Sequence, residues 1–493
     1  MKEILFGLSL NVSDFIRPEW SIKTIERFID TLKKHDLKGN IDFTPLTADM
    51  VAEHKPEIFK QIREAGFSVG LHGANRPLSS VGFIRDLDWD EAVKAVIDRY
   101  THRIDPRTGN LDLNRDGGWR TIERLFGKPP IGIGRPTLTG SEVAASFISA
   151  LKNLGARMFS SLRDHLNAES NLCWYGGILC RPDKIFIIPG VFLSYATGQT
   201  ATSPVRVIES LLGVLPKDGP NIIQLTMHET DFYVAAGRRW YDWERLETAF
   251  WPNEVQEKIW RAWDEVAEFI TRYRAVTYDD ILEMFEDDSE PVLTAKDLLE
   301  ASQYLLDYMS NWTGHSRSGL PDYVDFDFVY LSLCDVFQAL TYFLAYYHEH
   351  GSLPEEIKLR DLLGPIDYPR PSGSVNFGAA RGYGTVTTVD GKEIIESSYR
   401  VASQIKDRLP AFIPLEGFRR GVNAAEFLYL LAQEYRALAT GGKPEPAVYI
   451  EVDLLPRSVL GKITSVYEFP EKQLWYALLQ LWTYKPARLK QSE

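Results

Sequence analysis

Short apolar runs alternate with amphipathic stretches along the first 287 residues of the chain. The segment EILFGLSLNV at residues 3–12 is typical of a buried strand, and residues 21–37, SIKTIERFIDTLKKHDL, repeat apolar positions at helical spacing. Further along the chain, PEIFKQIREAG (56–66) has the apolar spacing of a helix, and FSVGLHG (67–73) after it is typical of a strand. Strands and helices that alternate at this spacing predict an α/β fold with a parallel sheet or barrel over residues 1–287.

The pattern changes from about residue 292, where helical periodicity dominates and a repeat is visible. DVFQALTYFLAYY in the first copy matches AEFLYLLAQEYRA in the second, and GSLPEEIKL matches GKPEPAVYI, at offsets close to ninety residues. A segment rich in Gly, Pro and Ser separates the copies. We therefore predict two mainly helical, duplicated modules after the α/β domain, at residues 292–370 and 389–488, joined by a linker at 371–388.

Charge and hydropathy narrow the class of protein. The chain of 493 residues carries a formal net charge of -13, which argues against nucleic acid as a partner. It contains no run of about 18 apolar residues, so we expect no membrane span. Its first residues lack the pattern of a signal peptide, which predicts a cytoplasmic location, or cell-wall association if a leader is missing. Cys173 and Cys180 could pair across a hairpin, but two half-buried thiols are the favoured interpretation.

Polar side chains lie in or directly after several of the predicted strands. Because the carboxyl ends of parallel strands meet at one edge of a sheet or barrel, we expect these side chains to lie together. They are Asn11 and Asp14 after the first strand, His72 and Arg76 after the third, and His228, Glu229 and Asp231 after a late strand. For each of the two histidines, a purely structural role is the alternative.

Several segments, in one order along the chain, resemble the motifs of a known family. TIERFIDTLKKHDLKGNIDF resembles its first helix and second strand, and IFKQIREAGFSVGLHG resembles the helix and strand that carry its His-x-x-x-His motif. GKPPIGIGRPTLTGS resembles its Arg-and-Pro motif, LTMHETDF its late strand with the catalytic His, and AVTYDDILEMF its closing strand and helix. Residues 1–287 thus resemble the polysaccharide deacetylase (NodB-homology) family, and the resemblance implies a distorted parallel (β/α) barrel.

The resemblance also implies a reaction, the removal of an N- or O-acetyl group from a glycan. In the family a divalent metal is held by an Asp and two His, a second Asp acts as base, and a late His acts as acid. His72 matches the first metal His, His228 matches the late acid, and Arg135 matches the Arg that orients the base.

The match is incomplete at the metal ligands. Asn11 and Val12 fall near the paired aspartates, and Arg76 replaces the second metal His. Arg cannot ligate a metal because its guanidinium stays protonated, and Asn is a weaker ligand than Asp. A divalent metal at the barrel mouth is therefore not favoured. Asp14 lies only a little further along the chain and could supply the base.

Three hypotheses remain for the barrel mouth. A shifted ligand set of Asp14, His72 and either Asp42 or His228 could hold a metal. Alternatively, the enzyme works without metal, with Arg76 stabilising the oxyanion and a carboxylate or His72 activating water. In the third hypothesis the barrel is inactive and binds a glycan or has a structural role.

The leading function is hydrolysis of a carbon–nitrogen or ester bond on an N-acetylated sugar or glycan. The runner-up is an inactive glycan- or cell-wall-binding protein, and a structural or assembly protein is a third class. The predicted catalytic residues are Asp14, His72, Arg76, Arg135 and His228, and the predicted substrate-binding residues are Asn11, Asp42, Glu229 and Asp231.

The segment DLNRDGGWRTIE has the spacing of a calcium-binding loop of the EF-hand type. Asp112, Asn114, Asp116, the carbonyl of Gly118 and Glu123 would supply oxygen ligands to a structural calcium ion. The alternative is a polar loop in which an Asp caps the following helix.

The helical modules carry Leu-Pro or Pro before a short apolar pair, and this pattern resembles the pseudomurein-binding repeats of archaeal cell-wall proteins. That resemblance implies a carbohydrate or cell-wall partner. The alternative is a helical packing domain, through which the chain could form a homo-oligomer.

Overall fold

The computed structural model describes most of the chain, and all structural statements below concern these parts. They are residues 3–71, 81–132, 145–162, 172–182, 186–187, 190–215, 221–235, 250–286, 290–310, 318–326, 329–369, 388–419, 421–456 and 472–490. The predicted linker at 371–388 therefore lies almost entirely outside the described residues.

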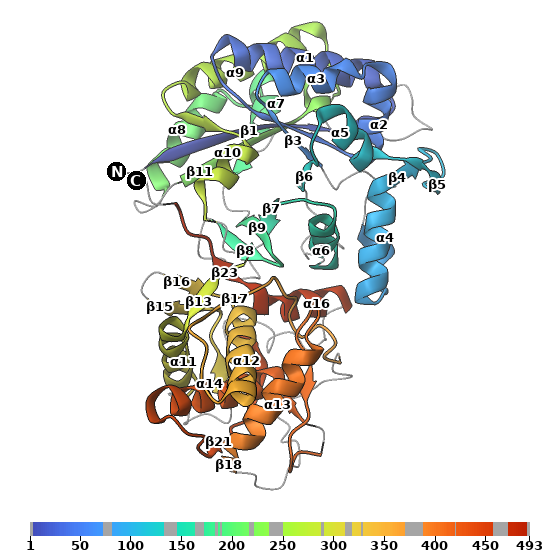
Figure 1. Ribbon diagram of the computed structural model, residues 1–493. Coiled ribbons are helices and arrows are strands. Elements are labelled where there is room, and N and C mark those ends of the chain that lie inside the picture. Colours follow the sequence, from blue (N-terminus) through green and yellow to red (C-terminus); the bar gives the residue numbers. More distant parts are fainter. Residues whose placement is uncertain are drawn as a thin grey trace.

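A parallel sheet of seven strands organises the N-terminal part (Figure 1). Its strands are β10 (Phe186–Ile187), β11 (Asn221–His228), β1 (Ile4–Val12), β2 (Asn40–Phe43), β3 (Ser68–Leu71) and β6 (Ile131–Gly132) in that order, with β12 (Arg274–Val276) beside the first half of β1. β1 is central because it pairs with β11 along one edge and with β12 and then β2 along the other. This result confirms the prediction of a parallel α/β sheet.

The two faces of β1 differ in character. Phe6, Leu8 and Leu10 belong to a large buried cluster that also includes residues of the helices, whereas Leu5 belongs to a second cluster. Since successive residues of a strand point to opposite faces, Ser9 and Asn11 share the face of Leu5. The second face is therefore polar toward the carboxyl end of the strand, although Ser9 is fully buried and Asn11 is only 7% exposed.

Helices connect the strands, and α1, α3, α7 and α9 cover one face of the sheet (Figure 1). The helices of this part are α1 (Pro18–Lys34), α2 (Pro45–His54), α3 (Glu57–Glu64), α4 (Trp89–Thr101), α5 (Gly118–Phe126), α6 (Ala145–Asn153), α7 (Gly190–Ala196), α8 (Pro204–Val214), α9 (Asn253–Ile270) and α10 (Tyr278–Met284). α10 contributes Tyr278 and Ile281 to the cluster on the polar face, opposite most of the helices.

Closure of the sheet into a barrel is not confirmed. In the described part of the chain no strand joins β10 to β6, so the seven-stranded sheet is open. β7 (Met158–Leu162) instead pairs in parallel with β9 (Ile178–Pro182), in a separate sheet of order β23-β8-β9-β7. In this sheet β8 (Cys173–Tyr175) and β9 form a hairpin in which Cys173 lies opposite Cys180, and both are buried free thiols.

Helices dominate from residue 290 onward, in two successive runs of elements (Figure 1). The first run contains β13 (Val292–Thr294), α11 (Ala295–Ser310), β14 (Ser318–Leu320), β15 (Val324–Phe326), β16 (Val329–Leu331), α12 (Leu333–His350) and β17 (Glu356–Lys358). The second contains β18 (Thr388–Val389), α13 (Gly391–Gln404), β19 (Phe412–Ile413), β20 (Val422–Asn423), α14 (Ala424–Gly441) and β21 (Ala447–Val448). In each run the first strand pairs antiparallel with the last.

The second helices of the two runs, α12 and α14, begin and end in the same way. Ser332 caps α12 and Asn423 caps α14, each in a capping box with an acidic residue three positions later. Both helices end at a glycine with φ of 71°, Gly351 and Gly442, a backbone conformation that glycine adopts without steric cost. α12 packs against α13, and α11 packs against α14. None of the helices in the described ranges has the length and apolar character needed to cross a bilayer.

The C-terminal segment returns to the α/β part. β22 (Val452–Pro456) pairs with β14, α16 (Lys472–Leu479) packs against α6, and β23 (Lys485–Pro486) pairs with β8. The Gln473 amide of α16 donates hydrogen bonds to the carbonyls of Ile84 and Leu87, at 2.9 and 3.1 Å, and accepts one from the Ser146 hydroxyl at 2.6 Å. The two parts of the chain are thus joined by specific polar contacts.

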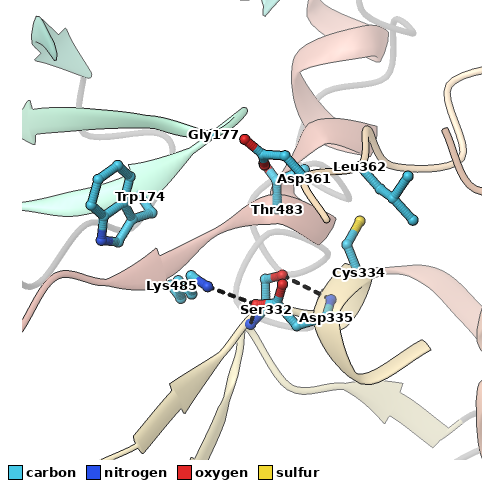
Figure 2. Close-up of a pocket in the computed structure, with 9 residues that line it drawn as sticks. All are labelled: Trp174, Gly177, Ser332, Cys334, Asp335, Asp361, Leu362, Thr483 and Lys485. Atoms are coloured by element: carbon cyan, nitrogen blue, oxygen red, sulfur yellow. Dashed lines mark hydrogen bonds and ion pairs between the residues drawn. The ribbon is translucent and has the colours of Figure 1, made fainter. Parts of the chain in front are cut away.

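A buried ion pair lies at this junction (Figure 2). Lys485 Nζ lies 2.8 Å from Asp335 Oδ2, and the two side chains are only 4% and 9% exposed. The same Asp335 oxygen accepts a hydrogen bond from the backbone of Ser332 at the start of α12. Beside it, Lys152 of α6 pairs with Asp361. These contacts connect β23 and α6 of the α/β part to the helical part.

Replacing Lys485 by Met should destabilise the protein, because Asp335 would stay buried without its counter-charge. We expect the free energy of unfolding to fall by about 3–5 kcal/mol in urea denaturation. Lys358→Met is the matched control, because Lys358 pairs with Glu290 at the surface, where both side chains are well exposed. It should cost about 0–1 kcal/mol. Equal losses in the two variants would contradict a stabilising role for the junction.

Candidate functional site

Three polar residues form a row at the carboxyl ends of the central strands. Asn11 of β1 lies in register with His228 of β11 on one side and with Asp42 of β2 on the other. In-register residues of parallel strands project from the same face, about 4.8 Å apart. We call these three residues the polar row. Gly70 continues it on β3 and adds no side chain, so the space next to Asp42 is not filled from that strand.

Asp42 is the most perturbed member of the polar row. Its side chain is 1% exposed, and its Oδ2 accepts a hydrogen bond from the Tyr278 hydroxyl at 3.0 Å. Its Oδ1 is buried and has no hydrogen-bond partner among the described residues. Burial raises the pKa of Asp42 to about 7, although the bond from Tyr278 opposes the shift. A carboxyl group with these properties can take up and release a proton near neutral pH.

Asn11 and His228 occupy the other two positions. The Asn11 side chain makes no hydrogen bond within the described part of the chain, so its amide is available to a ligand. His228 is half-buried and ends β11, and its backbone N–H donates to Asp231 Oδ2 at 2.8 Å. This bond begins a short 3-10 helix, η3 (Glu229–Phe232), and burial raises the pKa of Asp231. Asp231 therefore fixes the end of the strand that carries His228.

Glu229 ties the end of β11 to the loop that follows β1. Its Oε1 accepts hydrogen bonds from the backbone N–H groups of Ser13, at 2.6 Å, and Asp14. The side chain is fully buried, and its Oε2 has no hydrogen-bond partner in the described ranges. Burial raises the pKa of Glu229 to about 8, and the nearby charge of Asp14 adds to the shift. These contacts give Glu229 a structural role between two strand ends.

Asp14 is held at the start of α1. Its Oδ1 accepts from the backbone N–H groups of Ile16 and Arg17, and its Oδ2 accepts from the Arg17 guanidinium at 2.7 Å and the Tyr233 hydroxyl at 3.0 Å. Both oxygens are therefore engaged, and the residue is 1% exposed. Asp14 stabilises the turn into α1, and this environment disfavours its predicted use as a catalytic base.

Three of the predicted catalytic residues, His72, Arg76 and Arg135, lie outside the described residues. The strands that precede them are neighbours in the sheet, since Leu71 at the end of β3 pairs with Gly132 at the end of β6. β3 in turn pairs with β2, which carries Asp42. The roles of these three residues stay predictions.

The segment of the predicted calcium-binding loop lies in a hairpin, and calcium binding there stays a prediction. Residues Leu111–Asp116 form strand β5, which pairs antiparallel with β4 (His102–Ile104). The register is irregular, because Asp112 lies opposite Arg103 whereas Asp116 lies opposite the adjacent His102. Asp112, Asn114 and Asp116 are exposed, and Asp116 pairs with Arg120 at 2.9 Å.

The other two predicted calcium ligands lie in α5. Gly118 begins α5, where a Cβ would overlap the backbone of Pro45, so close packing against α2 accounts for this glycine. Glu123 is an exposed residue of α5. No three His, Cys, Asp or Glu side chains converge in a metal-binding group anywhere in the described ranges.

The described part of the polar row also does not fit the Asp-His-His metal site that the sequence resemblance implies. Asn11, a neutral and weaker ligand than Asp, stands in the middle of the row. Asp42 and His228 are separated by two strand spacings, about 10 Å between backbones. These three residues therefore do not form an Asp-His-His ligand set.

Comparisons with known proteins gave distant structural similarities alone. No family model and no curated protein matches the chain. Peptidoglycan deacetylase PdaC from Bacillus subtilis is 14% identical, over 57% of this chain and 90% of that chain, with a TM-score of 0.29. A CE4 family pseudoenzyme from Bacillus anthracis is 12% identical, over 57% and 66%, with a TM-score of 0.27.

A further similar structure is the 4-alpha-glucanotransferase from Thermococcus litoralis, at 14% identity over 58% of this chain and 41% of that chain, with a TM-score of 0.34. With TM-scores this low, the similarities assign no role to any residue of this chain. They also give no support to pseudomurein-binding repeats in the helical part.

Glu229→Gln should remove one source of pH-dependent stability. The unfolded chain releases the Glu229 proton near pH 4.5, whereas the folded protein keeps it to about pH 8. The folded state thus binds more protons in this window, and the free energy of unfolding falls as the pH rises through it, on the order of 5 kcal/mol for this residue. Gln keeps an oxygen for the Ser13 and Asp14 N–H groups, so the variant should lose this slope.

The measurement is urea denaturation of both proteins between pH 4.5 and pH 8, the two ends of this window. Glu254→Gln is the control, because the Glu254 side chain is 79% exposed and should leave the slope unchanged. An identical slope in wild type and Glu229→Gln would show that Glu229 is not held protonated by the fold.

Proposed function

We propose that the chain is a hydrolase that removes an acyl group from the nitrogen or oxygen of a sugar without a metal ion, with Asp42 as general base and His228 as general acid. One observation carries the proposal. Asp42 is buried with a free Oδ1, and it stands in register with Asn11 and His228 at the carboxyl ends of parallel strands. This is the place where α/β proteins position chemistry.

The polar row can serve each step of an acyl hydrolysis. Asp42 Oδ1 takes a proton from water as the water oxygen bonds to the acyl carbon. The carbonyl oxygen becomes an oxyanion, to which the Asn11 amide, in the middle of the row, donates a hydrogen bond. When the bond from carbon to nitrogen or oxygen breaks, protonated His228 gives its proton to the leaving atom. The products are the carboxylic acid and the free sugar, and a proton passes from Asp42 to His228 through solvent.

The spacing of the polar row supports this division of roles. Asp42 and His228 flank Asn11 on opposite sides, with about 10 Å between their backbones. This separation places the proposed base and the proposed acid on opposite sides of the Asn11 amide. The burial of Asp42 also favours the role of base, since a pKa of about 7 makes it a stronger base than an exposed carboxylate.

The class of substrate rests on the ordered sequence motifs that resemble polysaccharide deacetylases. We propose an N- or O-acetylated sugar or glycan as substrate, with Arg76 as a further oxyanion donor and His72 and Arg135 near the same strand ends. Glu229 and Asp231 hold the backbone around His228, and for them this role replaces direct substrate binding.

A glycan-binding protein without activity is the second candidate. Asn11 stands near the position of a carboxylate, and Arg76 stands at the position of a metal ligand, as expected if the deacetylase reaction had been lost. The nearly complete burial of Asp42 also restricts the approach of water. This candidate predicts binding of an acetylated glycan with no turnover.

Asp42→Asn should lower the rate of hydrolysis of acetylated sugars by about 10²–10⁴-fold, because the general base would be lost. In the wild type, activity should rise with pH through about 7, as Asp42 becomes ionised. Acetate release from a panel of N- and O-acetylated oligosaccharides gives the measurement. Asp49→Asn is the matched control, since Asp49 is also a buried carboxyl with a raised pKa but lies on α2. It should retain activity.

The same assay separates the remaining hypotheses. Activity that persists in a strong chelator supports the metal-independent reaction, and activity that is lost in chelator and restored by zinc contradicts it. If the wild type binds the panel but releases no acetate, the inactive glycan-binding protein is correct.

A further inference from the structure

A chain of buried hydrogen bonds leads to Asp42 from the polar face of the sheet. The Gln224 amide of β11 and the Asn40 amide of β2 both donate to the Ser9 hydroxyl, the latter at 3.3 Å. Ser9 Oγ lies 2.7 Å from the Tyr278 hydroxyl, which lies 3.0 Å from Asp42 Oδ2. The chain thus joins three strands to the first residue of α10. All five side chains are at most 2% exposed.

The direction of these hydrogen bonds follows from one backbone group. The Tyr278 N–H can only donate, and it bonds to the Asn40 side-chain oxygen at 2.9 Å. The Asn40 nitrogen must therefore face Ser9, which accepts from it and from Gln224. Ser9 then has its single hydroxyl proton left for Tyr278. Tyr278 accepts this proton and donates its own to Asp42 Oδ2.

We infer that Tyr278 is a positioning residue, whose hydroxyl fixes Asp42 Oδ2 as a hydrogen-bond acceptor and leaves Oδ1 as the oxygen that exchanges a proton. Because Tyr278 accepts a hydrogen bond from Ser9, its own hydroxyl proton is directed toward the Asp42 carboxylate. It stabilises the ionised form of Asp42 against the cost of burial. Tyr278 would thereby set the pH at which Asp42 ionises.

Other groups around Asp42 do not account for its ionisation. On β1 the neighbours Ser9 and Asn11 are neutral, and on β3 the in-register residue is Gly70. On α10, Asp279 follows Tyr278, but it is bound to Lys128 at 2.6 Å and to Ser68. His228 is two strands away. Within the described ranges, Tyr278 is the titratable side chain that contacts Asp42 directly.

This inference rests on the proposed function only for the role of Asp42 in turnover, so its test needs no substrate. The protonated carboxyl band of Asp42 can be isolated in infrared spectra as the difference between a protein and the same protein with Asp42→Asn. Titration of that band with pH gives the ionisation of Asp42 directly. Hydrolysis of acetylated sugars is followed separately.

Tyr278→Phe should shift the titration midpoint of the Asp42 band upward by about one pH unit or more. At pH values well below the midpoint, this shift lowers the ionised fraction of Asp42 about tenfold. Ser9→Ala should shift it in the same direction by less, because Tyr278 keeps its bond to Asp42. Tyr233→Phe is the matched control. It removes a buried hydroxyl that bonds to a carboxylate at the same distance, 3.0 Å, but the carboxylate is Asp14. It should leave the Asp42 titration unchanged.

An unchanged titration in folded Tyr278→Phe, or an equal shift in Tyr233→Phe, would overturn the inference. If Tyr278→Phe fails to fold, Ser9→Ala decides by the direction of its shift, and no shift there counts against the chain. A shifted Asp42 band in a protein that hydrolyses no acetylated sugar supports the inference and contradicts the proposed function. If turnover is found, its rise with pH should move by the same amount as the band.

Discussion

The parallel register of β1 with its two neighbours is the constraint on which the candidate site depends. Pairing of Asn11 with His228 and with Asp42 places three polar side chains on one face, although they are far apart in sequence. A shift of one residue in either pairing would move Asp42 or His228 to the opposite face, among the apolar residues that pack against the helices. The apolar alternation in β1, which buries Phe6, Leu8 and Leu10 on that face, therefore also protects the geometry of the site.

Burial of the polar side chains next to the polar row costs free energy, and the hydrogen bonds among them offset part of this cost. A buried carboxyl without partners is strongly destabilising, and Asp42 is almost fully buried. Its bond from Tyr278, and the bonds that orient Tyr278 through Ser9 and Asn40, satisfy one oxygen and leave the other. The unsatisfied oxygen of Asp42 lies at the carboxyl ends of the strands, in the polar row with Asn11 and His228. The same contacts thus stabilise the fold and determine which Asp42 oxygen stays without a hydrogen bond.

The alternation of strands and helices could be predicted from sequence because hydrophobic period alone determines it. The role of Asp14 could not, because its neighbours Arg17 and Tyr233 come from a helix start and a distant segment. The pairing of Leu111–Asp116 with β4 could not be predicted from the calcium-type spacing. Polar residues at every second position suit a loop that turns around an ion, but they also suit the exposed face of a strand. Tyr278 carried no signal, since nothing in sequence links a helix start to Ser9 and Asp42.

The position of the acid within the polar row bears on the chemistry that we propose. The sequence resemblance places carboxylates on the first strand, where this chain has Asn11, whereas its buried carboxylate stands at the same register on β2. We propose that this carboxylate acts as a base, because the Tyr278 bond holds its orientation and burial raises its affinity for a proton. The row contains an acid, a neutral hydrogen-bond donor and a histidine. Their order across the strands, with Asn11 between Asp42 and His228, supports the general acid–base catalysis that we propose.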